Sequence, residues 1–163
     1  MGRKPSTQSR RKLPRIGWRE WAALPAWNIA AIKAKVDTGA RTSSIHAARI
    51  ERFRRQGKDW LRFDIHPMQR DAQTTVHVEA ELVEYRKVTS SNGQTSLRPV
   101  VETQLQLSEL TWTIELTLAG RDAMGFRMLL GREALRNRFL IDVGRSFLAS
   151  QPPPSLGPSK RRS

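Results

Sequence analysis

The chain has 163 residues, of which 38% are hydrophobic and none is cysteine, and its formal net charge is +14 at pH 7. This length and hydrophobic content suit one domain with a single modest core, and the lack of cysteine excludes disulfide bonds, a thiol nucleophile and cysteine-ligated metals. No apolar run is long enough for a signal peptide or a membrane helix, so we expect a cytoplasmic protein that does not enter membranes.

Much of the positive charge lies near the two ends of the chain. Residues 1–15 hold six basic and no acidic side chains, and residues 160–162 hold three more basic ones. Proline, serine and glycine accompany these charges, which is typical of disordered segments. We therefore predict disordered basic tails at residues 1–15 and 151–163, suited to contact nucleic acid, and one folded domain at residues 16–150.

The predicted domain consists mainly of strands, because apolar and polar residues alternate along much of it. The predicted strands are, in chain order, Ile32–Val36, Leu61–Ile65, Val76–Val88, Pro99–Leu107 and Trp112–Leu118. Asn92-Gly93 predicts the turn of a long hairpin, since both residues tolerate positive φ. One short helix is predicted from Arg132 to about Arg138. Together these elements predict a mainly β, mostly antiparallel fold.

The most informative segment follows the first predicted strand, where Asp37-Thr38-Gly39 precedes a small residue, Ala40. Alone, this triplet is most often a turn that ends a strand, because turns are rich in Asp and Gly. A second segment, Leu129-Leu130-Gly131 before the short helix, makes the pattern more specific. Asp37 is therefore the candidate catalytic residue, since a carboxylate can act as an acid or a base.

The order of these two segments, with a glycine-tipped hairpin between them, resembles the retroviral-type aspartic proteases. Longer blocks resemble a bacterial family commonly labelled ATP-dependent zinc protease, whose members have a retropepsin-like fold. The blocks include residues 16–20, 33–42, 90–93, 98–100 and 126–133. The resemblance implies a closed β-barrel of the acid-protease half type with one short C-terminal helix.

The resemblance also implies an aspartic endopeptidase acting on peptide or protein substrates. One chain holds a single Asp-Thr-Gly, so a second Asp37 must come from another copy across a two-fold axis. In such a homodimer the two carboxylates share one proton and activate water. The implied supporting roles are the catalytic loop at Thr38, Gly39 and Ala40, packing beneath it at Leu129, Leu130 and Gly131, and a flap at Ser91, Asn92 and Gly93.

The chain departs from the viral pattern beside the site. The acidic residue that commonly follows the small residue there is replaced by Arg41, so Arg132 needs a new partner. Arg41 and Arg132 near the cleft favour binding of acidic or glutamylated substrates. The label itself finds no support: no phosphate-binding loop is present and the three histidines show no ligand spacing, so we expect no metal and no cofactor.

Two other interpretations stay open. A basic β domain that binds RNA or the ribosome accounts for the charge, although the basic residues concentrate in the tails and do not interleave with aromatic ones. A retropepsin fold without chemistry would serve as a binding module. Asp142-Val143-Gly144 offers a possible second acid, but it lacks the Thr and follows a hydrophobic run, so we interpret it as the end of a strand.

Overall fold

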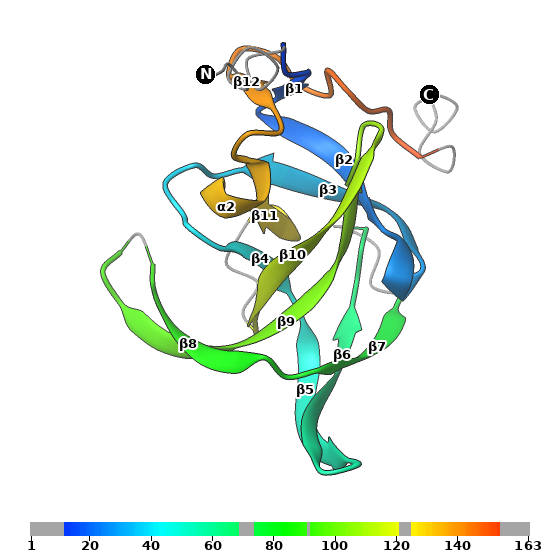
Figure 1. The fold of residues 1–163 in the computed structure, drawn as a ribbon, viewed down its shortest axis with the longest axis vertical. Helices are drawn as coiled ribbons and strands as arrows, with labels where there is room; N and C mark the ends of the chain where they lie inside the picture. The colour runs from blue at the N-terminus through cyan, green and yellow to red at the C-terminus, as the bar shows by residue number, and fades with distance from the viewer. Residues whose placement is uncertain (1–11, 69–73, 91, 121–124, 154–163) are drawn as a thin grey trace, which may run out of the picture.

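The computed structural model describes residues 12–68, 74–90, 92–120 and 125–153 (Figure 1). Within these residues the strands are β1 (Arg15–Gly17), β2 (Arg19–Leu24), β3 (Ile29–Val36), β4 (Ser43–His46), β5 (Ala48–Arg55), β6 (Lys58–Ile65), β7 (Val76–Glu81), β8 (Glu84–Thr89), β9 (Thr95–Leu107), β10 (Leu110–Ala119), β11 (Met128–Leu130) and β12 (Leu140–Asp142). A 3-10 turn, η1 (Pro25–Trp27), and a short helix, α2 (Arg132–Leu135), complete them. The mainly β fold with a short helix near its C-terminal end is confirmed.

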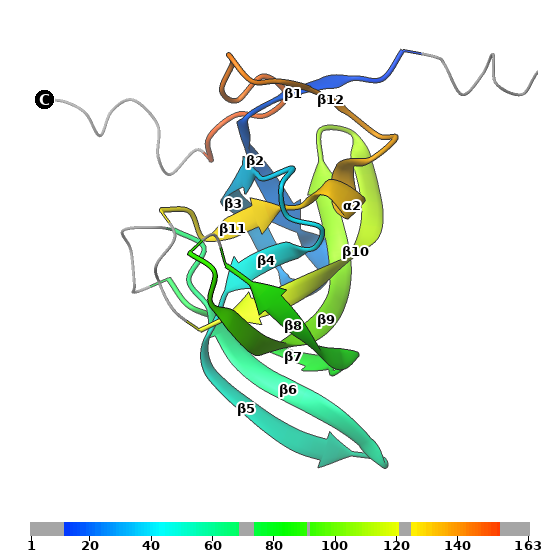
Figure 2. The same ribbon diagram turned by 90° about the vertical axis from the view of Figure 1, so that its left-hand side faces the viewer.

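The strands form three sheets. The largest has the order β10-β4-β11-β3-β2-β9-β8, a second contains β5, β6 and β7, and β1 pairs in parallel with β12. Figures 1 and 2 show the β5–β6 hairpin projecting from one end of the molecule and the β1–β12 pair lying at the other end. The Asp37 loop joins β3 to β4, which are two strands of the largest sheet.

The largest sheet curls back on itself without forming a true barrel. Strand β10 pairs with both β4 and β9, so ladder pairings run around six strands. However, β2 meets β9 through a single residue pair, Ala23 with Gln106. The register of β2 against β3 also shifts between Ala22 and Leu24, and such irregularities bend a strand and interrupt its ladder. The fold keeps the retropepsin-like arrangement without the closed barrel that the resemblance implied.

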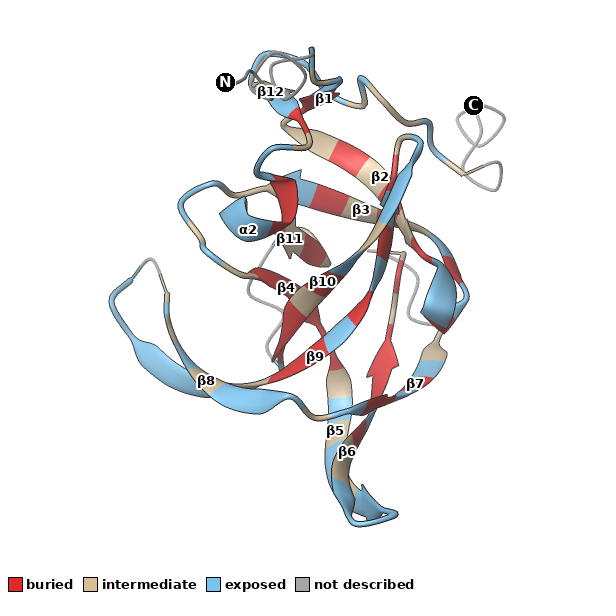
Figure 3. Cartoon of the chain, in the orientation of Figure 1, coloured by how far each residue is buried: buried red, intermediate tan, exposed pale blue. Residues whose placement is uncertain are grey.

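The core is built from the inward positions of the alternating strands, as the buried segments of Figure 3 show. Ile32 and Ala34 of β3, Phe63 of β6 and Leu116 of β10 are fully buried. The residue before each of them is half-buried or exposed, although Asp64 and Thr117, which follow Phe63 and Leu116, are buried as well. Burying one large aliphatic or aromatic side chain contributes about 1.5–3 kcal/mol. The strands predicted at these three places are confirmed.

The structure differs from the prediction where pairing partners change. The segment predicted as one strand, Val76–Val88, is two strands in different sheets, because the Leu82 N–H donates to the Asp59 carbonyl and the Val83 N–H donates to the Val100 carbonyl. The longest hairpin joins β9 to β10 and turns at Ser108, whose φ is 57°. Neither glycine nor asparagine occurs at that turn, so the turn was not predicted.

The boundaries of the predicted tails and helix also shift. Strand β1 begins at Arg15, the last residue of the predicted N-terminal tail, and the Pro14 carbonyl accepts a hydrogen bond from the Leu140 N–H. Residues 1–11 and 154–163 of the predicted tails lie outside the described residues. The helix ends at Leu135 rather than near Arg138.

Candidate active site

Asp37 lies immediately after β3, at the point where three strands meet. Strand β11 lies between β3 and β4, parallel to β3 and antiparallel to β4. The Asp37 N–H donates to the Leu130 carbonyl at 2.8 Å, and the Val36 N–H donates to the Trp18 carbonyl at 2.9 Å. Backbone bonds on both sides of the strand end therefore fix the position of the Asp37 main chain.

The segment after β11 stabilises the Asp37 loop through hydrogen bonds. The Gly131 N–H donates to Ser43 Oγ at 2.9 Å, and the Arg132 N–H donates to the Ala40 carbonyl at 2.8 Å. A side chain at Gly131 would place its Cβ 2.7 Å from the Thr42 carbonyl carbon. Only glycine allows this approach of two backbone segments, which explains the glycine of the Leu-Leu-Gly segment.

The structure thus brings together Asp37 and the residues expected beneath it. Arg132 also finds a partner: its Nη1 donates to the Thr38 carbonyl at 2.9 Å, so a backbone oxygen takes the place of a carboxylate. Arg41 lies 4.0 Å from the Glu133 carboxylate, and both side chains are largely exposed. Both arginines therefore have contacts within their own chain.

The Asp37 side chain is half-buried, and no hydrogen bond or ion pair joins its carboxylate to another described residue. A side chain at Gly39 would place its Cβ 3.5 Å from Asp37 Oδ1, an ordinary contact distance, so Gly39 leaves open space beside the carboxylate. By contrast, Asp142 Oδ1 accepts the Gly144 N–H at 3.1 Å and closes its own turn. Of the two Asp-x-Gly segments, the Asp37 segment is therefore the one whose carboxylate stays available.

The hairpin expected as a flap joins β8 to β9, and in Figure 1 it projects from the body on the same side as the loop between β3 and β4. Its turn is closed by the Gly93 N–H, which donates to the Ser90 carbonyl at 2.9 Å. Gly93 has a φ of 89°, as the turn signal predicts. Ser91 lies outside the described residues.

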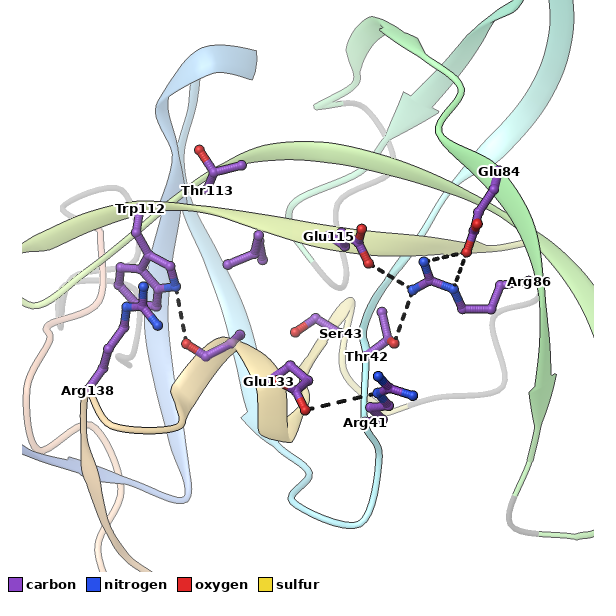
Figure 4. Close-up of a pocket in the computed structure, with 12 residues that line it drawn as sticks. Arg41, Thr42, Ser43, Glu84, Arg86, Trp112, Thr113, Glu115, Glu133 and Arg138 are labelled. Atoms are coloured by element: carbon purple, nitrogen blue, oxygen red, sulfur yellow. Dashed lines mark hydrogen bonds and ion pairs between the residues drawn. The ribbon is translucent and has the colours of Figure 1, made fainter.

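A cleft of about 680 Å³ separates the base of this hairpin from α2 and begins at Arg41 and Thr42, directly after the Asp37 loop (Figure 4). Arg86 lines one side of the cleft and donates to Glu115 at 2.8 Å and to Glu84 at 2.7 Å. The hydrogen bond that Arg86 donates to Glu115, with a smaller contribution from the one to Glu84, raises the pKa of Arg86 above its ordinary value. The charges inside this cleft are therefore largely paired with one another.

The cluster of Arg86, Glu84 and Glu115, which we call the Arg86 cluster, was not predicted from the sequence. Its members come from β8 and β10, and Arg86 Nη1 also lies 3.4 Å from Thr42 Oγ1. No short motif marks these residues, because the cluster forms only when β8 pairs with β9 and β10 pairs with β4. Their outward places on predicted strands were the only signal that the sequence contained.

The histidines do not gather into a ligand set. His77 Nδ1 lies 2.6 Å from Asp64 Oδ1, and His66 Nδ1 lies 3.1 Å from Thr75 Oγ1. Across the described ranges, no group of three or more histidine, aspartate or glutamate side chains is placed to hold a metal ion. In the same part of the chain, no helix has the length and apolar character needed to cross a membrane.

Comparisons with known proteins agree with this geometry. A family model described as "Retropepsin-like aspartic endopeptidase RimB" matches residues 15–152. Relatives named probable alpha-L-glutamate ligase are 48% identical over 132 residues in Shewanella pealeana, covering 81% of this chain and 29% of the relative, and 49% identical over 127 residues in Desulfotalea psychrophila, covering 78% and 27%. The chain therefore spans less than a third of the length of these curated relatives.

A solved structure is also similar. The crystal structure of Lpg0085, a protein of unknown function from Legionella pneumophila, matches with a TM-score of 0.71 and 28% identity. The match covers 85% of this chain and all of that one. With the family match extending over nearly all the described residues, the chain belongs to the RimB-like family of retropepsin-like aspartic endopeptidases.

Proposed function

We propose that the chain is an aspartic endopeptidase whose active site forms only when two copies pair. The observation that carries the proposal is the available carboxylate of Asp37, held on a loop that Leu130, Gly131 and Arg132 brace through the backbone. Membership of the family supports the same chemistry. One copy supplies one such carboxylate, so a symmetric pair is needed to supply two.

The mechanism follows from two carboxylates held close together. At a separation of roughly 3 Å two like charges cannot both ionise, so the pair holds one proton. The ionised Asp37 takes a proton from water, which attacks the peptide carbonyl, while the protonated Asp37 of the other copy donates to the carbonyl oxygen. Collapse of the tetrahedral intermediate then transfers a proton to the leaving nitrogen and breaks the C–N bond.

We also propose that the substrate is acidic or glutamylated. The net charge of +14 favours acidic substrates through long-range attraction. The printed name of the relatives, probable alpha-L-glutamate ligase, supports a link to glutamate-containing chains. Comparing cleavage of Glu-rich and Lys-rich peptide libraries tests this point, and equal rates or a preference for lysine would contradict it.

The main test is a subunit-mixing experiment with Asp37→Asn. The variant should keep its fold and dimerise but lose hydrolysis, and adding it to wild-type protein should form inactive mixed pairs. With equal amounts of each chain and random pairing, activity should fall to about a quarter of that of an all-wild-type sample, against about a half for independent monomers. Peptide cleavage and light scattering after chromatography provide the two measurements.

Asp142→Asn is the matched control, because Asp142 lies in the other Asp-x-Gly segment and closes only its own turn. We expect this variant to retain activity and to leave the wild-type rate unchanged on mixing. Loss of activity in Asp142→Asn but not in Asp37→Asn would contradict the proposal. Activity that chelators abolish while Asp37→Asn stays active would do the same.

A further inference from the structure

The outer side of β2 and β3 carries cations directly beside the Asp37 loop, and we call Arg19, Trp21, Lys33 and Lys35 the β2–β3 face. The two strands are antiparallel, with Arg19 opposite Lys35 and Trp21 opposite Lys33. Side chains of a strand alternate between its two sides, so the buried residues between them point into the core. The four members therefore share one outward surface of the β2–β3 pair. The two strands lie side by side in Figure 1.

Aromatic rings hold the cations of this face. The Arg19 guanidinium carbon lies 4.6 Å from the Trp18 ring centroid and 4.9 Å from that of Phe147. Lys33 Nζ lies 5.5 Å from the Trp21 ring centroid, and Lys35 Nζ lies 6.0 Å from that of Phe126. A ring orients a cation through its quadrupole but does not neutralise it. The ring contacts of Arg19 and Lys35 therefore leave their positive charges available to a ligand.

Two of these cations, Arg19 and Lys35, have no acidic partner within the part of the chain that the structure describes, because no ion pair joins either of them to a carboxylate. The one acidic residue of the two strands, Glu20, is fully buried. Its carboxylate accepts the Gly17 N–H at 2.6 Å and the Leu148 N–H at 2.8 Å. Like charges directly opposite one another on paired strands are unfavourable, so the Arg19–Lys35 pair calls for an acidic ligand.

The face runs into the candidate active site. Lys33 and Lys35 occupy alternate positions of β3, and Asp37 is the next position in the same alternation, just past the strand end. Alternate residues of a strand are about 6.6 Å apart, which is also the spacing of alternate side chains in an extended peptide. An acidic peptide lying along β3 could therefore place a carboxylate near Lys35 and its cross-strand neighbour Arg19 while it reaches Asp37.

We infer that the β2–β3 face binds the acidic side chains of an extended substrate peptide and so sets a preference for glutamate-rich chains. The inference rests on the proposed peptidase function and names where its acid recognition lies. It moves that recognition away from Arg41 and Arg132, because Arg41 lies beside Glu133 and Arg132 donates to the Thr38 carbonyl. Lys35, two residues before Asp37, is the specificity-determining residue that we place nearest the reacting bond.

A nucleic acid fits this face less well. Single-stranded nucleic acids bind by stacking bases on open aromatic rings. Here the Trp18 and Phe147 rings already contact Arg19, and Trp21 and Phe147 are stacked on each other with centroids 6.1 Å apart. The rings therefore hold cations in place and offer no free stacking surface.

The test measures binding separately from cleavage. The full chain carrying Asp37→Asn is titrated into a fluorescent octaglutamate peptide and its anisotropy is followed at about 0.1 M salt, where distant charges are screened. Adding Arg19→Gln and Lys35→Gln should weaken binding by about tenfold or more, because two charge-assisted contacts are lost. Lys35→Arg, which keeps the charge, should retain binding.

The matched control removes the same net charge elsewhere, with Arg54→Gln and Arg62→Gln on the β5–β6–β7 sheet, and should change the affinity by less than about twofold. Equal weakening by both pairs would overturn the inference, since only net charge would then matter. Tight binding of an oligouridine probe with no binding of octaglutamate would overturn it too. Loss of cleavage in wild-type protein with peptide binding intact would contradict the peptidase proposal alone. Circular dichroism confirms that each variant is folded.

Discussion

The β2–β3 face and the β5–β6–β7 sheet are built from the same kinds of residue but differ in their carboxylates. On the β5–β6–β7 sheet aromatic rings also contact cations, with the Arg55 guanidinium 4.7 Å from Trp60 and that of Arg62 4.3 Å from Phe53. There, however, each basic side chain of the three strands has an acidic partner. The pairs are Arg49–Asp64, Arg52–Asp59, Arg54–Asp59, Arg55–Glu79, Lys58–Glu81, Arg62–Glu51 and Arg62–Glu79.

This difference teaches that neither net charge nor cation–π contact identifies an acid-binding surface. Both regions have cations on rings, but among the described residues Arg19 and Lys35 of the β2–β3 face have no carboxylate partner, whereas the basic residues of the β5–β6–β7 sheet do. Exposed ion pairs contribute little to stability, so the pairs of the β5–β6–β7 sheet matter chiefly because they cancel charge. An acidic ligand should therefore distinguish the two regions although both are basic.

The largest effect on peptide binding is expected when a carboxylate is placed on the β2–β3 face, which removes the difference between the two regions. Lys35→Glu reverses one charge beside Asp37 and leaves Arg19 with an acidic neighbour across the strands. We expect the ratio of octaglutamate to octalysine binding to fall on the order of a hundredfold, because attraction becomes repulsion for one peptide and the reverse for the other. Anisotropy titrations in the Asp37→Asn background measure the ratio.

Arg62→Glu is the control for this reversal, since it makes the same charge change on the β5–β6–β7 sheet. That variant should keep the preference for octaglutamate. If Arg62→Glu lowered the ratio as much as Lys35→Glu does, the two regions would be equivalent to a ligand and the distinction between them would be wrong.

Part of this comparison could be predicted from the sequence. Alternation placed Lys33 and Lys35 on the polar side of a strand that leads into Asp37, and the Asp-Thr-Gly and Leu-Leu-Gly segments indicated the candidate site. The ring contacts of the β2–β3 face could not be predicted, because Phe126 and Phe147 reach Lys35 and Arg19 from distant parts of the chain.

The pairing of the β5–β6–β7 sheet was hidden for the same reason. Arg55 and Glu79 are far apart in the chain and meet through β6, which carries Arg62 between them. The strand of Arg55 was not predicted at all, since five of its eight residues are charged and only two large apolar residues stand between them. Local patterns predict which way a side chain faces, whereas the partner that it finds there depends on strand order.

The next prediction concerns Glu20, the buried carboxylate behind the β2–β3 face. Glu20→Gln keeps the shape but replaces one oxygen that accepts backbone N–H groups with a donor, next to Gly17 and the Leu148–Ala149 segment. We expect the free energy of unfolding to fall by about 1–3 kcal/mol, the usual cost of a mismatched buried polar group. Urea denaturation followed by tryptophan fluorescence measures the change.

Octaglutamate affinity should meanwhile change little in Glu20→Gln, because a carboxylate buried on the inner side does not neutralise Arg19 or Lys35. A gain in affinity as large as the loss caused by Lys35→Gln would show that Glu20 screens the face after all. The stability loss and the unchanged affinity together separate a structural carboxylate from a charge-cancelling one.

The smallest expected effect comes from freeing cations on the other region. Glu79→Gln removes the acidic partner of Arg55 and one of the two acidic partners of Arg62, and it leaves the nearby rings in place. If a cation held on rings without a carboxylate suffices to bind an acidic chain, octaglutamate affinity should rise by about two- to threefold, a small gain because Arg55 is exposed and Arg62 keeps Glu51. Unchanged affinity would show that proximity to Asp37 matters as well.

Lowering the pH cannot replace Glu79→Gln as a way to free Arg55, because Glu79 is harder to protonate than an ordinary glutamate. The hydrogen bond from Arg55, followed by that from Arg62, holds the pKa of Glu79 below its ordinary value, and Arg52 lowers the pKa of Asp59 in the same way. For a carboxyl group whose pKa is lowered in the folded state, the stabilising contribution is present above the unfolded pKa and is lost only as the pH falls through the folded one. The ion pairs should therefore persist to a pH at which the carboxylates of octaglutamate are already protonated. Carboxyl chemical shifts followed against pH check this order, and titration of Glu79 above the peptide's own carboxylates would contradict it.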